Sequence, residues 1–338
     1  MIPFFKNQSL AIDLGNSNTR MTDADNVLYA QSSCIVFDSK KSVKAIGDEA
    51  YKMFEKSHGG FRPVKPLKGG VIADYDSATA MISQMASLAR VNKSRFSGFD
   101  HIISGVPYST TEVERRALRD ALDLLSPRKR YLLFEPIAAA LGMGIDIGQP
   151  EGKMIIDIGG GITEIVIVSL SGIVAFQSTK VAGDTFDILI QDHFRRQRGI
   201  IIGNQTAERI KLKVGSVLVD LDPEPHPEVI SGKDIKTGIP ISYKVGYREI
   251  AGVLSGAFEA IERCAQRVLQ TCPPELSADI HKNGVYVTGG GALIKGIKPR
   301  LESTLQVPIH IDSNPLESVS KGASLTLRNP QRYRAVLV

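Results

Sequence analysis

The stretch that decides the fold is Met154-Ile-Ile-Asp-Ile-Gly-Gly-Gly-Ile-Thr-Glu-Ile-Val-Ile-Val168. The apolar, mostly β-branched runs on either side of the glycines predict a strand and its antiparallel return partner in a sheet covered on both faces. Gly159, Gly160 and Gly161 permit positive φ and let backbone N–H groups approach an anion. Asp157 would repel a phosphate there unless a cation lay between them. The stretch therefore suggests a phosphate loop that works with Mg²⁺, and a tight glycine hairpin is the structural alternative.

Two further stretches repeat the strand–glycine pattern. In Leu10-Ala-Ile-Asp-Leu-Gly-Asn-Ser-Asn-Thr-Arg-Met21, an apolar strand leads into Asp13, Gly15 and small polar residues. Two acid–glycine turns about half a chain apart predict two similarly built halves that face one another across a cleft. The third turn, Val285-Tyr-Val-Thr-Gly-Gly-Gly-Ala-Leu-Ile294, has no acid and suits a neutral sugar, a base or the first phosphate.

Length and composition describe an ordinary globular protein. The 338 residues, 43% hydrophobic and 23% charged, predict two lobes or one large α/β unit with an ample core. The net charge of +5 is far from a nucleic-acid-binding footprint. Three cysteines, without metal or CxxC spacing, indicate a reducing cytoplasm. No apolar run approaches the length of a transmembrane helix, and the N-terminus lacks the features of a signal peptide.

Periodicity predicts the order of helices and strands. We expect short extended pieces at 27–75 and 216–247, read as insertions. The helix that follows the Thr111–Glu114 capping box should turn Val113, Ala117, Ala121 and Leu124 inward. The other expected strands are 101–107 and 131–134, and the expected helices are 76–89, 111–125, 137–141, 185–196, 205–214 and 249–270.

Several motifs are missing, which narrows the chemistry. The sequence contains no GxxxxGK[ST], GxGxxG, HExxH or GxSxG. The three glycine turns, two of them with an acid, suit binding of a nucleotide with Mg²⁺. The cation would lie between Asp13, Asp157 and the phosphates and would be bound largely through water molecules. Glu135, at a strand-to-helix junction, would orient the attacking water, or it is only a helix N-cap. Glu208 and Lys211, one helical turn apart, are on their own most simply a surface salt bridge.

These stretches, together with Val106-Pro-Tyr-Ser-Thr-Thr-Glu-Val-Glu-Arg-Arg-Ala117, Phe134-Glu-Pro-Ile-Ala-Ala-Ala140 and Thr206-Ala-Glu-Arg-Ile-Lys211, resemble the bacterial actin family, MreB. The resemblance covers essentially the whole chain. It implies an α/β, actin-like (ribonuclease H-like) two-lobed ATPase fold, with duplicated βββαβα cores, inserted subdomains and a nucleotide cleft. By it, domain I comprises 1–144 plus 317–338 with an insertion at roughly 33–70, and domain II comprises 145–316 with an insertion at roughly 183–247.

The resemblance also implies roles for individual residues, with ATP or ADP and Mg²⁺ as cofactors. Glu135 would be the hydrolytic residue, and Asp13 and Asp157 would hold Mg²⁺ through water. Glu208 and Lys211 would contact the ribose and adenine. The expected loop residues are Asp13, Gly15, Asn16, Ser17 and Asn18 in the first phosphate loop, Asp157, Gly159, Gly160 and Gly161 in the second, and Gly289, Gly290, Gly291 and Ala292 at the nucleoside.

Three positions depart from the family's pattern. Asn16 stands where threonine is usual, Gly69 where aspartate is usual, and Ile162 replaces a threonine that has a part in hydrolysis. An isoleucine side chain cannot hydrogen-bond a water or a γ-phosphate. We therefore expect nucleotide binding to be intact and turnover to be slowed.

The family forms filaments on the inner face of the cell membrane that guide cell-wall synthesis and set rod shape. Implied partners are further copies of the chain, the lipid surface, and membrane proteins of the elongation machinery (RodZ-like, MreC/MreD-like), with no nucleic acid. Ile2, Phe4, Phe5 and Phe96 are the candidate membrane contacts. Such weak anchors would act together along a filament.

Other readings stay open on the sequence alone. A non-hydrolysing or slowly hydrolysing scaffold paralogue is the main rival, because of Ile162 and Asn16. A membrane tether of the division machinery (FtsA-like) would be expected to carry an amphipathic C-terminal anchor, whereas Asn329 to Val338 is weakly patterned. A small-molecule kinase of the same superfamily would need a substrate-side base, which nothing marks.

Overall fold

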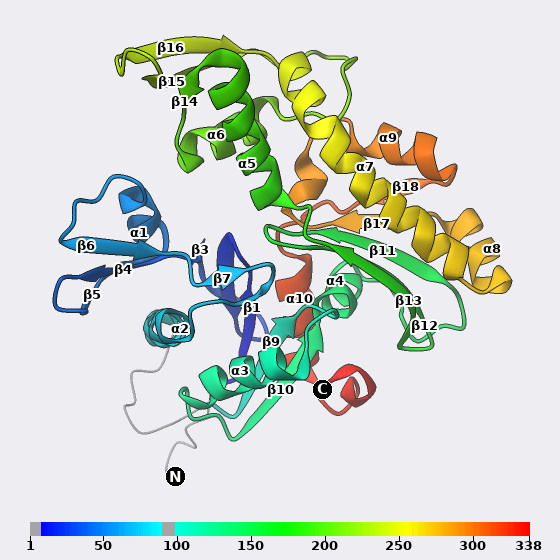
Figure 1. Ribbon diagram of the computed structural model, residues 1–338. Coiled ribbons are helices and arrows are strands. Elements are labelled where there is room, and N and C mark those ends of the chain that lie inside the picture. Colours follow the sequence, from blue (N-terminus) through cyan, green and yellow to red (C-terminus); the bar gives the residue numbers. More distant parts are fainter. Residues whose placement is uncertain (1–7, 90–98) are drawn as a thin grey trace. The chain divides into compact units, whose positions relative to one another are not determined.

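The computed structural model describes residues 8–89 and 99–338. The chain forms two compact units (Figure 1), one of Met1–Gln149, Leu170–Gly172 and Leu316–Val338, the other of Pro150–Ser169 and Ile173–Pro315. The four candidate membrane contacts, Ile2, Phe4, Phe5 and Phe96, lie outside the described residues. No helix of the described ranges is long and apolar enough to cross a membrane.

The first unit is built on a five-stranded sheet with strand order β3-β2-β1-β9-β10. The central strand β1 is antiparallel to β2 and parallel to β9, and β10 is parallel to β9. The carboxyl ends of β1, β9 and β10 therefore lie on the same edge of the sheet. The strands are β1 (Leu10–Leu14), β2 (Asn18–Thr22), β3 (Val27–Ser32), β9 (His101–Val106) and β10 (Lys129–Phe134).

Helices cover this sheet and close its core. The apolar face of α2 (Tyr75–Ala89) packs against alternate residues of β1, and Met81, Ile82 and Met85 share a cluster with Leu10 and Ile12. Two other helices, α4 (Glu135–Gly142) and α10 (Ser318–Arg328), pack tightly on each other. The chain ends in a 3₁₀ turn (Arg334–Val336).

The predicted inward face of α3 (Glu112–Asp123) is correct at Ala121, which is buried, but wrong at Val113 and Leu124. Its N-terminal capping box is present: the Thr111 hydroxyl accepts from the Glu114 N–H, and the Glu114 carboxylate accepts from the Thr111 N–H. However, Val113 is 78% exposed and Leu124 is 59% exposed. The buried residues are Leu118, Ala121, Leu122 and Leu125. Both sets have helical spacing, and only packing against the sheet distinguishes the two faces.

The segment between β3 and α2 forms the small elements that the sequence predicts as an insertion. A three-stranded sheet has the order β5-β4-β6 and packs on α1. A two-stranded ribbon, β7–β8, follows it. These elements are β4 (Ile35–Asp38), β5 (Val43–Ile46), α1 (Gly47–Met53), β6 (Phe61–Val64), β7 (Leu67–Lys68) and β8 (Val71–Ile72).

The second unit repeats the sheet of the first. Its strand order is β13-β12-β11-β17-β18, with β11 antiparallel to β12 and parallel to β17, and with β18 parallel to β17. This is the first sheet's order and direction, strand for strand, so the predicted duplication is confirmed. The strands are β11 (Lys153–Ile158), β12 (Thr163–Ser169), β13 (Gly172–Thr179), β17 (Val285–Thr288) and β18 (Ile309–Ile311).

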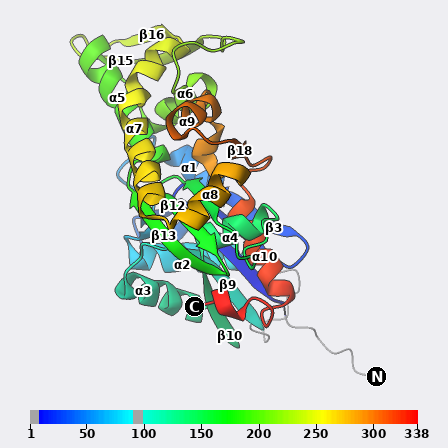
Figure 2. The same cartoon turned by 90° about the vertical axis from the view of Figure 1, so that its right-hand side faces the viewer.

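The core of the second unit lies between this sheet and its helices. All residues of β12 are buried, as the doubly apolar sequence predicts for a sheet covered on both faces. The longest helix, α7, lies along β12 (Figures 1 and 2). The helices are α5 (Gly183–His193), α6 (Asn204–Val214), α7 (Tyr247–Thr271), α8 (Pro274–Asn283) and α9 (Ile297–Leu305), and Gly290–Leu293 is a 3₁₀ turn.

A small antiparallel sheet, with strand order β14-β15-β16, extends this unit. It joins the end of α5 through a π-helical turn (Phe194–Arg198). Its strands are β14 (Ile200–Ile201), β15 (Glu228–Asp234) and β16 (Pro240–Val245).

Candidate functional site

The two acid–glycine turns have the same backbone construction. In the first unit, Leu14 pairs with Thr19, and the N–H of Gly15 donates to the Asn18 carbonyl at 3.1 Å. In the second, the N–H of Gly159 donates to the Ile162 carbonyl at 3.0 Å, inside a turn of the same length. Each turn therefore joins an aspartate-bearing central strand to its antiparallel neighbour through four residues.

The glycines are required here for space and not for positive φ. Neither Gly15 nor Gly159 has a left-handed backbone, so neither uses the positive φ that glycine permits. A Cβ on Gly15 would lie 2.8 Å from the Asn18 carbonyl oxygen, and one on Gly159 would lie 3.0 Å from that of Ile162. The contact at Gly15 is shorter than real side chains make with backbone, so a Cβ there would force the turn open, and at Gly159 the Ile162 carbonyl would have to shift by a few tenths of an ångström.

The first turn is fastened to two other parts of its unit. The Ser33 N–H donates to the Ser17 carbonyl at 2.9 Å, and the Ser33 hydroxyl donates to the Gly15 carbonyl. On the other side, the Asn16 side-chain oxygen accepts from the Gly70 N–H at 2.9 Å. Of the three positions that depart from the pattern, Asn16 makes this contact and Gly69 directly precedes its partner Gly70. Gly69 has φ +63°, with no atom close to where a Cβ would stand.

Asp13 stands on β1 opposite Arg20 of β2. Burial raises the pKa of the Asp13 carboxyl to about 6, although the nearby Arg20 guanidinium acts in the opposite direction. The Arg20 guanidinium itself donates to the Leu316 carbonyl oxygen. A buried carboxylate with so little compensation would gain stability from a bound cation.

Glu135 is the first residue of α4, and Phe134 is the N-cap. The N-cap alternative for Glu135 is therefore excluded. Its side chain packs on Gly105 near the end of β9, where a Cβ on Gly105 would lie 3.3 Å from Glu135 Cγ and 3.4 Å from Val319 Cγ1. Asp13 on β1 and Glu135 after β10 thus flank β9 at the carboxyl edge of one sheet, which is where α/β proteins place ligands.

In the second unit, the beginning of α5 holds the second turn. The Gly183 N–H donates to the Gly159 carbonyl at 3.1 Å, and the Asp184 N–H donates to the Gly160 carbonyl at 2.7 Å. These bonds occupy carbonyls of the loop, so they fix its backbone while using none of its N–H groups.

The third glycine turn packs directly on the second. Gly289 has φ +81°, and a Cβ there would lie 2.4 Å from Asp157 Oδ1 and 2.5 Å from the Ile158 carbonyl oxygen. A Cβ on Gly291 would lie 2.2 Å from Ile158 Cγ2. The Gly289–Ala292 turn and the buried Asp157 therefore form one continuous surface at the ends of β17 and β11.

Lys211 does not make the predicted simple surface pair. Its ammonium donates to the Gly183 carbonyl at 3.1 Å and to Asp187 Oδ2 at 2.8 Å. Glu208 lies close enough to Asp187 to raise the pKa of that carboxyl. Both residues of the predicted pair thus belong to the surroundings of the second turn, through α5.

The structure brings the predicted residues together in two groups, one in each unit. Asp13, the Gly15–Asn18 turn and Glu135 share an edge of the first sheet. Asp157, the Gly159–Gly161 turn, the Gly289–Ala292 turn and Lys211 gather in the second unit. Sequence reasoning missed Ser33, Gly183 and Asp187, which fasten these loops. For Gly183, the signal was the glycine–acid pair Gly183–Asp184 directly before the predicted helix 185–196.

The carboxylates at the glycine turns fit Mg²⁺ better than a metal ion that needs three or more protein ligands. No group of three or more His, Cys, Asp or Glu side chains in residues 8–89 and 99–338 is arranged to hold a metal ion. Mg²⁺ keeps several waters and commonly takes only one or two carboxylates together with phosphate oxygens. Asp13 in the first unit and Asp157 in the second are each a carboxylate of that kind.

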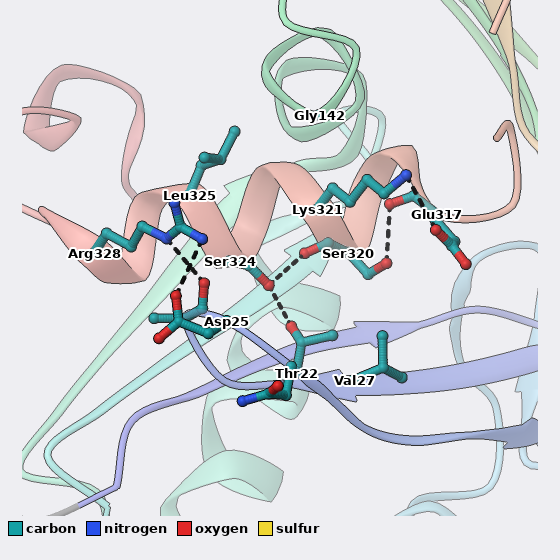
Figure 3. Close-up of a pocket in the computed structure, with 12 residues that line it drawn as sticks. Thr22, Asp25, Val27, Gly142, Glu317, Ser320, Lys321, Ser324, Leu325 and Arg328 are labelled. Atoms are coloured by element: carbon teal, nitrogen blue, oxygen red, sulfur yellow. Dashed lines mark hydrogen bonds and ion pairs between the residues drawn. The ribbon is translucent and has the colours of Figure 1, made fainter. Parts of the chain in front are cut away.

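A cavity of about 300 Å³ in the first unit lies elsewhere (Figure 3). None of the predicted site residues lines it. Its walls are the β2–β3 turn and α10, and its charges are paired: Arg328 with Asp25 at 3.2 Å, and Lys321 with Glu317 at 3.1 Å. Because each of these cations is already paired with a carboxylate, the cavity is not suited to bind a phosphate.

Comparison with known proteins agrees with this description. A sequence model of the MreB/Mbl protein family matches residues 7–335. The chain is 37% identical to the cell shape-determining protein Mbl of Bacillus subtilis over 325 residues, which cover 95% of this chain and 96% of that protein.

Solved structures give the same result. The crystal structure of MreB 5 of Spiroplasma citri bound to AMPPNP superposes with a TM-score of 0.91 at 35% identity, covering 97% of this chain and 98% of that one. The same protein bound to ADP gives 0.90. The MamK double helical filament gives 0.79 at 17% identity over 95% of this chain and 99% of that one, a similarity of fold alone.

The duplicated sheets with their matched turns thus define an actin-like, two-lobed α/β protein. Within that class, the chain belongs to the MreB/Mbl family of bacterial cell shape-determining proteins.

Proposed function

We propose that this chain is a bacterial actin that binds ATP and ADP with Mg²⁺ and assembles into filaments on the inner face of the cell membrane, where it organises cell-wall synthesis. The observation that carries the nucleotide part is the identical four-residue turn after Asp13 and after Asp157. A relative of 35% identity whose structure contains AMPPNP supports it. In this proposal the two compact units correspond to domains I and II of the family.

The residues divide the work by their chemistry. The N–H groups of Gly15 and Gly159 close the two turns, so the remaining N–H groups of the Gly15–Asn18 and Gly159–Gly161 turns would bind phosphate oxygens. Glu208, Lys211 and the Gly289–Ala292 turn would hold the nucleoside. Asp13 and Asp157 would hold Mg²⁺ through water, and the ion, when bound, would neutralise charge on the phosphates. Glu135 would orient a water for hydrolysis.

A slowly hydrolysing scaffold is the second candidate function, and Ile162 favours it. The backbone carbonyl of Ile162 closes the second turn, so this residue's part in shaping the loop does not depend on its side chain. Its aliphatic side chain cannot donate to water or phosphate. Binding and hydrolysis are therefore separable at this position, and the chain would bind nucleotide while turning it over slowly.

One experiment tests the polymerising ATPase. Electron microscopy would be done with ATP, with ADP and without nucleotide, alongside phosphate release by wild type and Glu135→Ala. We expect nucleotide-dependent filaments and a slow release that falls further in Glu135→Ala. Filaments with negligible release would favour the scaffold, and release without filaments would contradict the filament proposal.

Membrane attachment has its own test. Ile2, Phe4, Phe5 and Phe96 would contact lipid, and filament formation would combine many weak anchors. In liposome flotation, a variant with Phe4, Phe5 and Phe96 changed to serine should remain in the unbound fraction. Undiminished binding would count against all three residues.

The protein partners are proposed from the family alone. They are the membrane proteins of the elongation machinery (RodZ-like, MreC/MreD-like), which a filament on the membrane would meet. Co-purification from membranes with the wild type, and not with a variant unable to polymerise, would support them.

A further inference from the structure

Lys211 and Asp187 form an ion pair that is largely shielded from solvent. The side chains are 12% and 15% exposed, and the ammonium also donates to the Gly183 carbonyl at 3.1 Å. Pairs at the surface are worth little, but a shielded pair fixes both partners because neither can be rehydrated cheaply. The Lys211 amine is thus held at one point, between α5 and α6.

That point is beside the second glycine turn. A Cβ on Gly183 would lie 3.4 Å from the Gly159 carbonyl oxygen, 3.4 Å from Gly160 Cα and 3.5 Å from Lys211 Nζ. Only the glycine backbone therefore separates the ammonium from the loop. If the Lys211 ammonium were unpaired in this position, it would attract a phosphate bound at the turn.

Asp187 depends on Lys211 in return. Within the described residues, Asp187 Oδ1 is buried and has no hydrogen-bond partner, so Lys211 supplies the partner of the other oxygen. Burial raises the pKa of Asp187 to about 6; the Lys211 ammonium lowers it, and the neighbouring Glu208 and Asp184 raise it. The carboxylate is consequently charged at neutral pH, with its charge directed at one ammonium.

We propose that Asp187 is a positioning residue of the nucleotide site. It holds the Lys211 ammonium against the Gly183 carbonyl, where Lys211 can contact the nucleoside. Its negative charge also neutralises the Lys211 ammonium, which would otherwise attract the phosphates of the nucleotide. This inference rests on the nucleotide binding proposed above. It adds that the two parts of the nucleotide are bound by different groups: the N–H groups of the Gly159–Gly161 turn bind the phosphates, and Lys211 binds the uncharged nucleoside.

Removing the charge of Asp187 should change the affinities for the nucleoside and for the phosphates in opposite directions. Asp187→Asn keeps the shape and one acceptor but removes the charge, so Lys211 is held less firmly and its charge is exposed. Adenosine should then bind more weakly, by about tenfold, because the hydrogen bond that holds the Lys211 ammonium is no longer assisted by a carboxylate charge. Tripolyphosphate should bind several-fold more tightly, because the net charge beside the loop becomes more positive.

The experiment is displacement of a fluorescent ATP analogue from the full chain by ADP, by adenosine and by tripolyphosphate, at pH 7.5 in buffer of about 0.1 M salt so that screening is fixed. The matched control is Asp192→Asn on the same helix, a carboxylate that pairs with exposed Arg195 and Arg196. It should change none of the three inhibition constants. In a Lys211→Met background, Asp187→Asn should leave adenosine inhibition unchanged, since Asp187 acts on the nucleoside only through Lys211.

Opposite shifts for adenosine and tripolyphosphate in Asp187→Asn would support the inference, because general damage to the fold weakens both. Shifts in the same direction, or none, would overturn it. If the Asn variant does not fold, Lys211→Met serves instead. It should weaken both adenosine and tripolyphosphate, because Asp187 is left unmasked, while its circular dichroism stays that of the wild type, which separates this result from damage to the fold. Unchanged adenosine binding in the folded variant would overturn the inference. A wild type that no nucleotide displaces would contradict the proposed function instead.

Discussion

Gly322 on α10 crosses Ala138 on α4 with no room for a methyl group: a Cβ on Gly322 would lie 1.8 Å from the Ala138 carbonyl oxygen. One helical turn away, a Cβ on Gly142 would lie 1.9 Å from the Ser318 carbonyl oxygen. The two helices thus touch through their backbones (Figure 3). Because α4 begins at Glu135, the helix near the C-terminus determines where that carboxylate stands.

We therefore expect Gly322→Ala to separate α10 from α4. The free energy of unfolding should fall by about 3 kcal/mol, the upper part of the range for overpacking, because the clash is with backbone. Phosphate release should fall with it as Glu135 moves. Gly252→Ala is the matched control: it lies within α7 with nothing near its Cβ position, and should stabilise by about 0.5–1 kcal/mol. Equal effects of the two changes in urea unfolding would contradict the close crossing.

Gly289→Ala should damage nucleotide binding beyond the cost of its backbone conformation. The new methyl would meet Asp157 Oδ1, so either the third turn or the aspartate must move. Gly144→Ala also places alanine at positive φ, +77°, but in open space, and measures the backbone cost of about 1–2 kcal/mol alone. By calorimetric titration with ATP, Gly289→Ala should bind more than about tenfold more weakly, a loss of about 1.4 kcal/mol. If Gly289→Ala bound ATP as tightly as Gly144→Ala, the third turn would not be part of the nucleotide site.

The raised pKa of Asp13 predicts that the ligand-free protein loses stability as pH rises. The folded carboxyl titrates at about 6, and its ordinary value is 3.8, so between these values the folded state holds a proton that the unfolded chain releases. Stability therefore falls through this window and the loss is complete above pH 6. Its size is about 3 kcal/mol, from about 1.4 kcal/mol for each unit of pKa.

Urea unfolding of wild type and Asp13→Asn, in Mg²⁺-free buffer from pH 4.5 to 7.5, checks this. The variant lacks the titrating carboxyl, so it should become the more stable protein as pH rises. Parallel curves would show that Asp13 is not penalised by burial. Arg20→Met should raise the pKa further and move the wild-type loss to higher pH, because the guanidinium is the group that lowers it.

A buried ion pair between α7 and α9 should be worth far more to stability than an exposed pair on the same helix. Arg300 makes a two-bond contact with Glu262, at 2.9 and 2.7 Å, and also donates to Val217 and Ser255. Arg300→Met should cost about 3–5 kcal/mol, because it leaves the buried Glu262 carboxylate with the Thr304 hydroxyl, which donates at 2.7 Å, but without its cation. Arg263→Met breaks the exposed pair with Glu259 and should cost less than about 1 kcal/mol. Thermal and urea unfolding measure both, and similar losses would argue against burial as the cause.

Ile162→Thr should raise the rate of phosphate release without changing the affinity for ATP. The turn is closed by the backbone carbonyl of residue 162, which the substitution keeps, and threonine adds a hydroxyl that can hydrogen-bond a water. Ile162→Val, which is also β-branched and has no hydroxyl, is the control for shape. The hypothesis of slowed turnover would be abandoned if release were unchanged in Ile162→Thr or rose equally in Ile162→Val.

Local pattern accounts for what could be predicted in advance. The β-branched runs around Asp157 and Asp13 can be buried only as central strands, and the glycine after each acid permits a turn that a Cβ would obstruct. The capping box at Thr111 likewise specifies a helix start from neighbouring residues alone. Strand, turn and cap are short-range consequences of side-chain shape, so the duplicated frame and its three glycine turns are present in the sequence.

Which way a helix faces, and which distant residues meet, depend on packing that no local pattern contains. The spacing of α3 allows an inward face with Val113 and Leu124, and the sheet selects the one with Leu118 and Leu122. The sequence offers Lys211 a partner three residues away, Glu208, yet its ammonium bonds Asp187 on another helix.

The sequence by itself thus determined the fold class, the acid–glycine turns and the chemical character of the site, because these follow from residues that are neighbours in the chain. Only the tertiary structure decided that Gly322 and Ala138 touch, that Asp187 masks Lys211, and that Gly289 rests on Asp157. Those contacts join segments far apart in the chain, and their geometry is fixed by close packing of the whole unit around each of them.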